Sequence, residues 1–251
     1  MPALLEADQL NKSFGGLKAL ADLSLAVESG QVFGLIGPNG SGKTTAINVL
    51  TGVYSATSGA VRLGGRTLTG KSPHEIALAG VARTFQNLRI FASRSVLDNV
   101  RAAQTAVCRS LVTRFSAISN AEEKALTAEA HALVERFGLG GRANLPAGTL
   151  SYGEKKRLEI ARALAMKPKM LLLDEPAAGM NPVELDWLRN VIREIGSSGV
   201  GVVLIEHHMK LVMNVCDRIV VLNFGRKIAE GTPAEVAADP AVIEAYLGRA
   251  D

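Results

Sequence analysis

The stretch GPNGSGKT, at residues 37–44, fits the pattern GxxxxGK[ST] and is the most informative motif of this chain. It follows a short apolar run, residues 31–36, and opens an expected helix over residues 43–50. In this context the glycines let backbone N–H groups turn toward the phosphates of a nucleotide, and the helix N-terminus adds positive potential. Lys43 is expected to contact the β- and γ-phosphates, and Thr44 to ligate Mg²⁺. The expected nucleotide contacts of the loop are Asn39, Gly40, Ser41, Gly42, Lys43, Thr44 and Thr45.

A second motif, MLLLDEP at residues 170–176, is an apolar run that ends in two carboxylates. Such a run is typical of a buried parallel strand. A strand beside the phosphate loop would bring Asp174 to the Mg²⁺ shell, directly or through water. Glu175 would then lie near the γ-phosphate, where it can orient or deprotonate the attacking water. The alternative is a solvated strand end that carries two acids without chemistry.

A third motif, LSYGE at residues 150–154, precedes an expected helix over residues 152–166. Ser151 and Glu154 have the spacing of a capping box, with Ser151 as the N-cap. That interpretation leaves Gly153 unexplained, because glycine disfavours the first turn of a helix. A glycine at this position permits close approach of an anion to the helix N-terminus.

The order of the expected elements indicates an α/β fold. Residues 3–9 and 17–28 alternate like antiparallel strands, and residues 60–68 form a hairpin with Gly64-Gly65 as the turn. Residue 81 begins a strand that ends at 85, and residues 87–148 have mainly helical spacing. Strands at 169–173, 200–205 and 217–223 then alternate with helices at 182–196 and 208–215, and a basic hairpin arm follows at 226–231. This alternation predicts a mostly parallel sheet with helices on both faces.

Taken together, LSYGEKKRLEIARAL, GPNGSGKT and LLLDEP resemble, in order and spacing, the motifs of ATP-binding-cassette (ABC) ATPases. The resemblance covers essentially the whole chain. It implies one P-loop NTPase (RecA-like) domain over residues 1–251, with a mostly parallel core sheet and an N-terminal antiparallel β subdomain. Residues 1–86 and 167–231 would form this nucleotide-binding core. Residues 87–166 would form the inserted α-helical subdomain with the signature motif, and residues 232–251 a helical tail.

The resemblance implies further site residues. Phe14 resembles the aromatic residue that stacks on adenine, although a phenylalanine there can also belong to a core. Gln86 resembles the glutamine that joins the catalytic Mg²⁺ and water to the membrane partner, and His207 the switch histidine at the γ-phosphate. Asn181 occupies the last position of a dimer loop that usually ends in aspartate, so it can still form hydrogen bonds across a dimer but carries no charge.

The same resemblance implies a mechanism and partners. Two ATPase subunits, identical or different, would face each other head to tail around ATP and Mg²⁺. Ser151 and Gly153 would then contact the ATP of the other subunit. Transmembrane permease subunits would dock near residues 86–91, where Ile90 and Phe91 offer apolar side chains; the alternative is that these side chains pack inside the helical insert. The chain would therefore be peripheral, at the cytoplasmic face of the inner or plasma membrane.

The segments SFGGLKAL, QNLRIFASRSVLDNV, PAAGMNP and IEHHMKLVM resemble the larger-insert ATPase of branched-chain amino-acid uptake systems. Closely similar cassettes serve urea uptake and lipopolysaccharide or lipid export, and residues of an ATPase subunit do not touch the cargo. Other ABC ATPases act on nucleic acid outside membranes, usually with two cassettes or a long coiled coil. This chain has one cassette and a net charge of only +4, so no nucleic-acid partner is expected.

Composition limits the remaining possibilities. The chain has 251 residues, 47% of them hydrophobic, which excludes intrinsic disorder. A mean hydropathy of +0.18 is high, yet its longest apolar runs fall well short of the roughly 20 residues of a membrane-spanning helix. The first residues lack the pattern of a signal peptide, and two cysteines, Cys108 and Cys216, make no disulfide framework, which favours a reducing cytoplasm. We expect the apolar excess in strands buried on both faces, and in a docking surface near Ile90 and Phe91.

Overall fold

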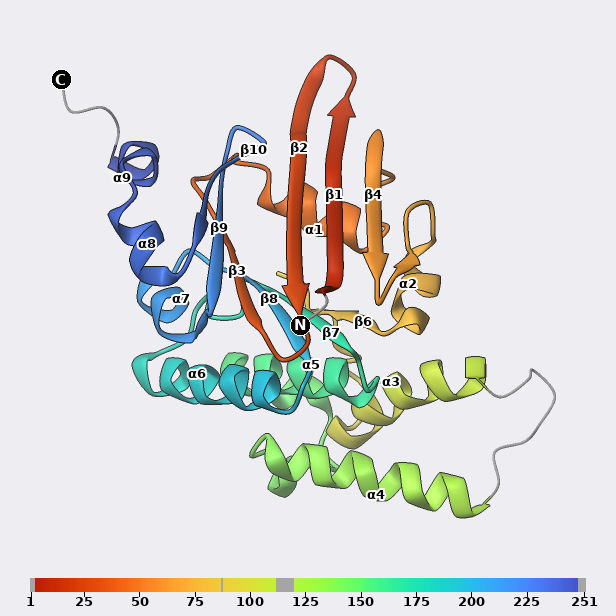
Figure 1. The fold of residues 1–251 in the computed structure, drawn as a ribbon. Helices are drawn as coiled ribbons and strands as arrows, with labels where there is room; N and C mark the ends of the chain where they lie inside the picture. Colours follow the sequence, from red (N-terminus) through yellow and green to blue (C-terminus); the bar gives the residue numbers. More distant parts are fainter. Residues whose placement is uncertain (1–2, 87, 112–119, 248–251) are drawn as a thin grey trace.

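The computed structural model describes residues 3–86, 88–111 and 120–247, and for residues 106–111, 120 and 247 it describes the backbone alone. Two β-sheets carry helices around them (Figure 1). The first sheet is antiparallel and has the strand order β2-β1-β4-β5. Its strands are β1 (Ala3–Phe14), β2 (Leu17–Glu28), β4 (Ser58–Leu63) and β5 (Arg66–Thr67).

The second sheet is the core sheet, with the strand order β10-β9-β3-β8-β7-β6. Its strands are β3 (Val32–Ile36), β6 (Val81–Arg83), β7 (Met170–Asp174), β8 (Gly201–Ile205), β9 (Arg218–Asn223) and β10 (Arg226–Gly231). The five strands from β9 to β6 are parallel, and only the edge strand β10 is antiparallel to its neighbour. The expected α/β class with a mostly parallel sheet and an N-terminal antiparallel sheet is therefore confirmed.

Strand β7 shows why the central strands are apolar throughout. Met170 and Leu172 belong to the core cluster between the two sheets, whereas Leu171 and Leu173 belong to the cluster on the opposite face. All four side chains are fully buried. Successive side chains of a strand point to opposite faces, and both faces here are covered, so an unbroken apolar run is required. Much of the high mean hydropathy is accounted for in this way.

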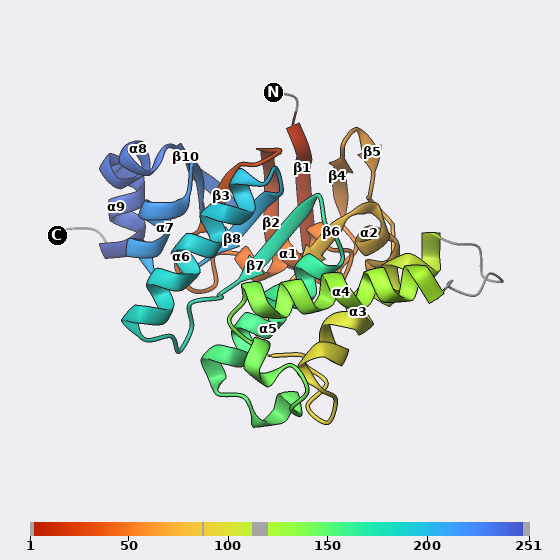
Figure 2. The same ribbon diagram turned by 90° about the horizontal axis from the view of Figure 1, so that it is seen from below.

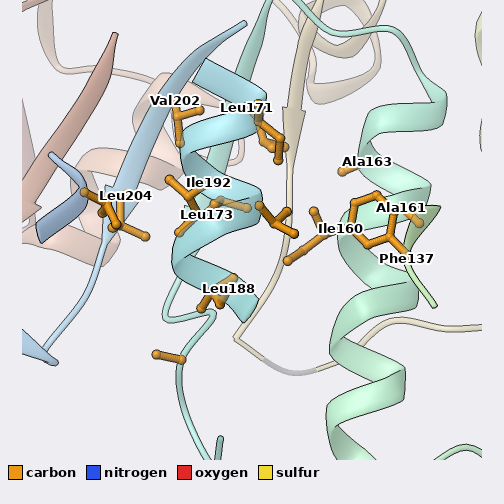
Figure 3. Close-up of a cluster of buried hydrophobic side chains, with 14 of the residues drawn as sticks. Phe137, Ile160, Ala161, Ala163, Leu171, Leu173, Leu188, Ile192, Val202 and Leu204 are labelled. Atoms are coloured by element: carbon orange, nitrogen blue, oxygen red, sulfur yellow. The ribbon is translucent and has the colours of Figure 1, made fainter. Parts of the chain in front are cut away.

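The helical subdomain contains α3 (Val96–Leu111), α4 (Asn120–Arg136) and α5 (Tyr152–Ala165), which pack against one another (Figure 2). Two short 3₁₀ turns, Gly140–Arg142 and Ala147–Thr149, connect α4 to α5. Apolar residues of α5 continue the core of the parallel sheet: Ile160 lies with Leu171 of β7 and Ile192 in one buried cluster (Figure 3). The expected helical insert is confirmed, and it is joined to the core through α5.

The remaining helices are α1 (Lys43–Leu50), α2 (Pro73–Ala79), α6 (Pro182–Ser197), α7 (Met209–Val215), α8 (Pro233–Ala238) and α9 (Pro240–Leu247). Helix α1 packs in the cluster between the two sheets, whereas α6 and α7 cover the other face of the core sheet. Helices α8 and α9 lie next to β10. Among the described residues, no helix has the length and apolar character needed to cross a membrane.

The sequence analysis missed helix α2. Its N-terminus carries a complete signal, since Ser72 is the N-cap, Pro73 occupies the first turn and Glu75 closes a capping box. Two strand ends also differ from expectation: β1 runs on to Phe14, and β6 stops at Arg83. Extending β1 matters for the site, because it brings Phe14 to the end of the strand that borders the nucleotide loop.

Candidate functional site

The phosphate loop connects β3 to α1, and close packing requires two of its glycines, Gly37 and Gly42. A Cβ atom on Gly37 would lie 2.1 Å from the carbonyl oxygen of Leu222, and one on Gly42 would lie 2.8 Å from that of Ala19. Gly42 also has a φ of 105°, a left-handed conformation that favours glycine. Gly42 is the N-cap of α1, and no side chain caps that N-terminus within the described part of the chain. The first amides of α1 are therefore available to an anion.

Lys43 is folded over this loop and almost completely buried. Its Nζ donates hydrogen bonds to the carbonyl oxygens of Gly37 at 2.8 Å and Pro38 at 2.9 Å. Burial lowers the pKa of Lys43, while the nearby carboxylates of Glu175 and Asp174 oppose that shift. The ammonium group is thus placed in the middle of the loop by neutral carbonyls, which a phosphate oxygen can replace.

Three residues expected to take part in hydrolysis meet at one carboxylate. Gln86 Nε2 donates to Glu175 Oε2 at 2.9 Å, and His207 Nε2 lies 2.9 Å from Glu175 Oε1. They come from three separate segments: the chain after β6, the end of β7 and the end of β8. Parallel strands end on the same edge of the sheet, which is why residues so distant in sequence converge here.

The backbone of Glu175 is unusual, because its φ is +48°. Its amide donates to the carbonyl oxygen of Ile205 at 2.9 Å, which ties it to the end of the neighbouring strand β8. A left-handed non-glycine residue costs of order 1–3 kcal/mol and persists only where its surroundings impose it. The strain turns the carboxylate toward Gln86 and His207.

Asp174 is held by Arg83, a residue that the sequence analysis did not single out. Arg83 Nη2 lies 2.8 Å from Asp174 Oδ2, and both side chains are nearly buried. The same guanidinium donates to Asn48 Oδ1 at 2.7 Å and Thr51 Oγ1 at 3.2 Å, both on α1 or at its end. The available signal was the position of Arg83, three residues before Gln86 on the strand paired with β7. Arg83 fixes the expected metal-shell carboxylate against the helix of the phosphate loop.

The oxygen donors at this site suit Mg²⁺. Thr44 and Asp174 offer a hydroxyl and a carboxylate, and Gln86 an amide oxygen. The described residues contain no group of three or more His, Cys, Asp or Glu side chains able to cage a metal ion. Mg²⁺ is typically held by one or two carboxylates while it keeps waters and phosphate oxygens as its other ligands. This sparse donor set therefore fits a nucleotide-bound Mg²⁺.

A hollow of about 470 Å³ connects the phosphate loop to the acidic cluster. It is lined by Phe14, Leu17, Lys18, Ala19, residues 39–45, Gln86, Glu175, His207, Phe224 and Gly225. Phe14 is 43% exposed, and its ring stands edge-on to Tyr54 with centroids 5.2 Å apart. Its exposure excludes the core role that was the alternative for this residue. The hollow thus unites every expected contact of the subunit's own nucleotide except Asp174.

The signature helix α5 begins at Ser151, and this residue does not line that hollow. The expected capping box is present: Ser151 Oγ accepts from the amide of Glu154, and Glu154 Oε2 accepts from the amide of Ser151 at 2.8 Å. The hydrogen bond from the Ser151 backbone lowers the pKa of Glu154. Gly153 is buried, and a Cβ atom there would lie 1.9 Å from Glu184 Oε1. The Glu184 carboxylate thus occupies the space that a side chain at position 153 would take.

The expected dimer-loop residue Asn181 is the N-cap of α6. Its Oδ1 accepts from the amide of Glu184 at 3.0 Å, and Glu184 Oε2 accepts from the amide of Asn181 at 3.0 Å. An asparagine caps a helix as well as an aspartate does, so this local role survives the loss of charge. Because Glu184 also fills the space beside Gly153, the dimer loop and the signature helix are packed together.

The two adjacent histidines have different environments. His207 contacts Glu175, whereas His208 is the N-cap of α7 and accepts from the amide of Leu211 at 3.3 Å through Nδ1. Glu206, just before them, is buried and was missed by the sequence analysis. Its carboxylate accepts from the amides of Ala177 at 2.7 Å and His207 at 3.0 Å, and burial raises its pKa. An acidic residue at the end of an apolar strand and before the histidine was the available signal.

The two apolar residues expected at the docking surface, Ile90 and Phe91, differ in exposure. Phe91 is 51% exposed, as a docking residue should be, and the Arg162 guanidinium lies 5.0 Å from its ring centroid. Ile90 is partly buried and packs on the core of the helical subdomain, which is the alternative stated for it. Residue 87 lies outside the described residues. The exposed apolar surface at this place is therefore mainly that of Phe91.

Comparisons with known proteins agree with this geometry. Residues 20–178 match a family described as ABC transporter, and residues 226–251 one described as branched-chain amino acid ATP-binding cassette transporter. The chain is 47% identical to the high-affinity branched-chain amino acid transport ATP-binding protein BraF of Pseudomonas aeruginosa, over 98% of each chain. Identity to LivG of Escherichia coli K12, a protein of the same description, is 42% over 98% of each. The ADP conformation of MJ1267, an ATP-binding cassette of an ABC transporter, matches with a TM-score of 0.86 and 33% identity, covering 99% of this chain and 100% of that one.

Proposed function

Since this chain belongs to the ABC transporter family, we propose that it is the ATP-binding and ATP-hydrolysing component of a branched-chain amino acid transporter. The observation that carries the proposal is the full-length identity of 42–47% to ATP-binding proteins of that transport system. The match of residues 226–251 to the corresponding family supports the same cargo independently of the catalytic motifs.

The subunit's own site binds the nucleotide. The open N-terminus of α1 and the loop amides bind the phosphates, and Lys43 exchanges its contacts with Gly37 and Pro38 for the β- and γ-phosphate oxygens. Phe14 stacks on the base at the opposite end of the hollow. Thr44, Gln86 and Asp174 would hold Mg²⁺, Asp174 directly or through water, with Arg83 fixing the carboxylate of Asp174. When bound, Mg²⁺ neutralises negative charge that develops on the phosphates.

Hydrolysis then uses the cluster at Glu175. A water oxygen attacks the γ-phosphorus, the bond to the oxygen of ADP breaks, and the water gives its proton to the Glu175 carboxylate. Gln86 and His207, each 2.9 Å from a Glu175 oxygen, orient that carboxylate, and both can turn toward the water or the γ-phosphate as the site fills. A positioned base of this kind contributes about 10²–10⁴-fold to the rate.

The signature helix serves the site of a second ATPase subunit, identical or different. Ser151 and Gly153 do not line the subunit's own hollow, although they form a helix N-terminus suited to phosphate. We place them, together with Asn181, against the nucleotide of the partner subunit. Closing of the two subunits on ATP and opening after hydrolysis then provide the mechanical step.

Membrane subunits dock at residues 86–91, and the chain is peripheral at the cytoplasmic face of the membrane. Exposure of Phe91 at 51% supports this site, because its ring offers apolar surface to a partner on the segment that follows Gln86. Docking there reaches the ATP site through Gln86, which binds Glu175.

Co-purification and transport test the function. A tagged chain, expressed in its native host, is pulled down from detergent-solubilised membranes, and its integral membrane partners are identified and reconstituted with it in vesicles. We expect ATP-dependent uptake of leucine, isoleucine or valine, and none of urea. Uptake of urea, or movement of a lipid, would reassign the cargo while keeping the ATPase role. Salt-sensitive binding of DNA or RNA without a membrane partner would overturn the transport function.

A further inference from the structure

A charged row of side chains runs along one face of the signature helix α5, away from its N-terminus. Lys156 and Glu159 are buried, and Lys156 Nζ lies 3.9 Å from Glu159 Oε2. Arg162, one turn further on, is half-buried. Burial raises the pKa of Glu159 and lowers the pKa of Arg162, which shows that both charges have left water at a cost. The groups that contact these charges therefore indicate the function of this row of side chains.

Those partners are backbone groups of residues 85–91, the segment that contains Gln86 and Phe91. Glu159 Oε1 accepts from the amide of Phe85 at 3.1 Å, and the amide of Arg89 acts on the same carboxylate. Arg162 Nη1 donates to the carbonyl oxygen of Arg89. The carboxylate thus holds the segment by its N–H groups, and the guanidinium holds it by a C=O group.

One ring contact reinforces this attachment, and a second lies within the segment itself. The Arg162 guanidinium of α5 lies 5.0 Å from the ring centroid of Phe91, and the Arg89 guanidinium lies 4.2 Å from the ring centroid of Phe85 in the same segment. Cation–π contacts of this kind are attractive within about 6 Å. The segment is therefore fastened to α5 at both of its ends, at Phe85 and at Phe91.

A row of buried charges need not serve coupling, because such networks also occur as structural ion pairs. For stability alone, however, apolar side chains of similar volume are often equal or better. The observation that favours coupling is the identity of the partners: the row holds a loop whose other contact, through Gln86 Nε2, is the catalytic Glu175. The same helix carries Ser151 eight residues before Glu159, about 12 Å along the axis at 1.5 Å per residue.

We propose that Glu159 and Arg162 are positioning residues that fasten the 85–91 segment to the signature helix. A membrane subunit docked on this segment thereby sets the position of Ser151 and Gly153 in the facing ATP site. The inference rests on the proposed function, since it needs a membrane subunit at residues 86–91. It adds a second route to the one through Gln86: docking acts on the subunit's own site through Gln86, and on the partner's site through α5.

The test uses Glu159→Gln, which removes the charge but keeps the shape of the side chain. Arg162→Lys is the second variant; it keeps the charge but loses the planar fork that reaches both Arg89 and Phe91. The matched control is Glu123→Gln, which removes the same charge from the exposed ion pair with Arg101 between α4 and α3. All are measured as isolated subunits and as complete transporters in vesicles.

Three quantities are compared: the Kd of the isolated subunit for ATP, the hydrogen exchange of the peptide that contains Phe85 and Arg89, and the stimulation of ATPase activity by the membrane subunits. We expect Kd to stay within 2-fold, because neither residue lines the ATP hollow. Exchange should accelerate at the 85–91 segment. Stimulation should fall roughly 2- to 30-fold, the range found for residues along a coupling network, whereas Glu123→Gln should change none of the three.

Two outcomes overturn the inference, and they differ from failure of the proposed function. Faster exchange with unchanged stimulation would mean that the contacts are only structural. A loss of ATP affinity as large as the loss of stimulation would mean that the variants damage the ATP site itself. If the unmodified subunit is not stimulated by any membrane subunit, the proposed function fails, and the inference fails with it.

Discussion

The two helix N-termini that we propose as phosphate sites, those of α1 and α5, are built in opposite ways. Helix α1 begins at Gly42 without any side-chain cap among the described residues, and its first amides face an open hollow. Helix α5 begins at Ser151 with a complete capping box, in which Glu154 places a carboxylate at the N-terminus. An uncapped N-terminus gains most from a bound anion, because its amides have no competing partner.

This difference suggests separate roles for the N-termini of α1 and α5 in binding the nucleotide. Helix α1 is preorganised for phosphate within one subunit and can bind a nucleotide alone. At the N-terminus of α5 the capping box already occupies the amides of Ser151 and Glu154 and places a carboxylate there, so phosphate gains less and must displace or share the Ser151 hydroxyl. We infer that nucleotide affinity resides at α1, and that α5 responds only when a second subunit brings a nucleotide to it. The predictions below, from the largest effect to the smallest, test this division.

The largest effect is expected for Glu175→Gln. The amide cannot accept the proton of the attacking water, so ATP hydrolysis should fall about 10²–10⁴-fold. ATP binding at α1 should persist, because the phosphate loop is untouched, and closed dimers should accumulate on ATP. Turnover and gel filtration with ATP measure both. Asp186→Asn, which neutralises an exposed carboxylate on α6, is the control; normal turnover by Glu175→Gln would refute the assignment.

Lys43→Ala tests the affinity assigned to α1. Loss of a charge-assisted hydrogen bond costs about 1.5–3 kcal/mol, which corresponds to roughly 10- to 100-fold weaker ATP binding. Calorimetry on the isolated subunit measures this, with the exposed Lys210→Ala as the control. Ser151→Ala in the same assay should leave Kd unchanged, while the lost cap lowers the free energy of unfolding by about 1 kcal/mol. Equal weakening by both would contradict the division between the two helices.

Gly153→Ala separates the packing role of this glycine from its phosphate role. The new methyl group displaces the Glu184 carboxylate, which breaks its hydrogen bond with the Asn181 amide and costs about 1 kcal/mol of stability. The double variant Gly153→Ala/Glu184→Ala relieves the clash and lacks the same hydrogen bond, while Asn181 still accepts from the backbone amide of residue 184, so its thermal stability should match that of Glu184→Ala alone. Its ATP hydrolysis should stay low if Gly153 also admits a phosphate of the partner subunit. Recovery of hydrolysis to the level of Glu184→Ala would assign Gly153 to packing alone.

The smallest effect is a pH dependence of the α5 cap. The pKa of Glu154 is lowered in the folded state, so its contribution to stability is present above its unfolded pKa of about 4.5 and is lost as the pH falls through the folded value. The contribution of Glu159 to the pH dependence of stability has the opposite sign, because burial raises the pKa of Glu159. Because both the unmodified protein and Glu154→Gln contain Glu159, comparing the two cancels the contribution of Glu159. Between pH 5.5 and 3.5, the free energy of unfolding measured in urea should fall more for the unmodified protein than for Glu154→Gln. An identical fall in both would mean that the α5 cap does not contribute to this pH dependence.

Local sequence signals predicted most elements of the fold. The strand β7 and the helix α1 appear within one residue of their expected bounds, because unbroken apolar runs and helix-opening motifs depend on neighbouring residues alone. Helix α2 was missed although Ser72 and Glu75 mark it, since a seven-residue helix leaves little apolar periodicity to detect. The order β10-β9-β3-β8-β7-β6 was not predicted, because strand neighbours are chosen by packing between segments far apart in the sequence.

Site residues divide in the same way. Lys43, Asp174, Glu175 and His207 belong to motifs that the chain displays on its own. Arg83 and Glu206 are marked in the sequence only by their positions near Gln86 and His207; what they touch, the carboxylate of Asp174 and the amide of His207, is visible only in the structure. A side chain whose role is to hold another becomes visible only when its partner is in place.

By itself, the sequence determined the α/β class, the motif of the phosphate loop and the caps of α5 and α6, because glycine spacing, apolar runs and caps act within a few residues. Only the tertiary structure decided three further matters. It gathered Gln86, Glu175 and His207 at one edge of the sheet, placed Glu184 in the space beside Gly153, and fastened residues 85–91 to α5 through Glu159. Each of these contacts joins segments far apart in the chain, and their positions follow from the packing of strands and helices around a common core.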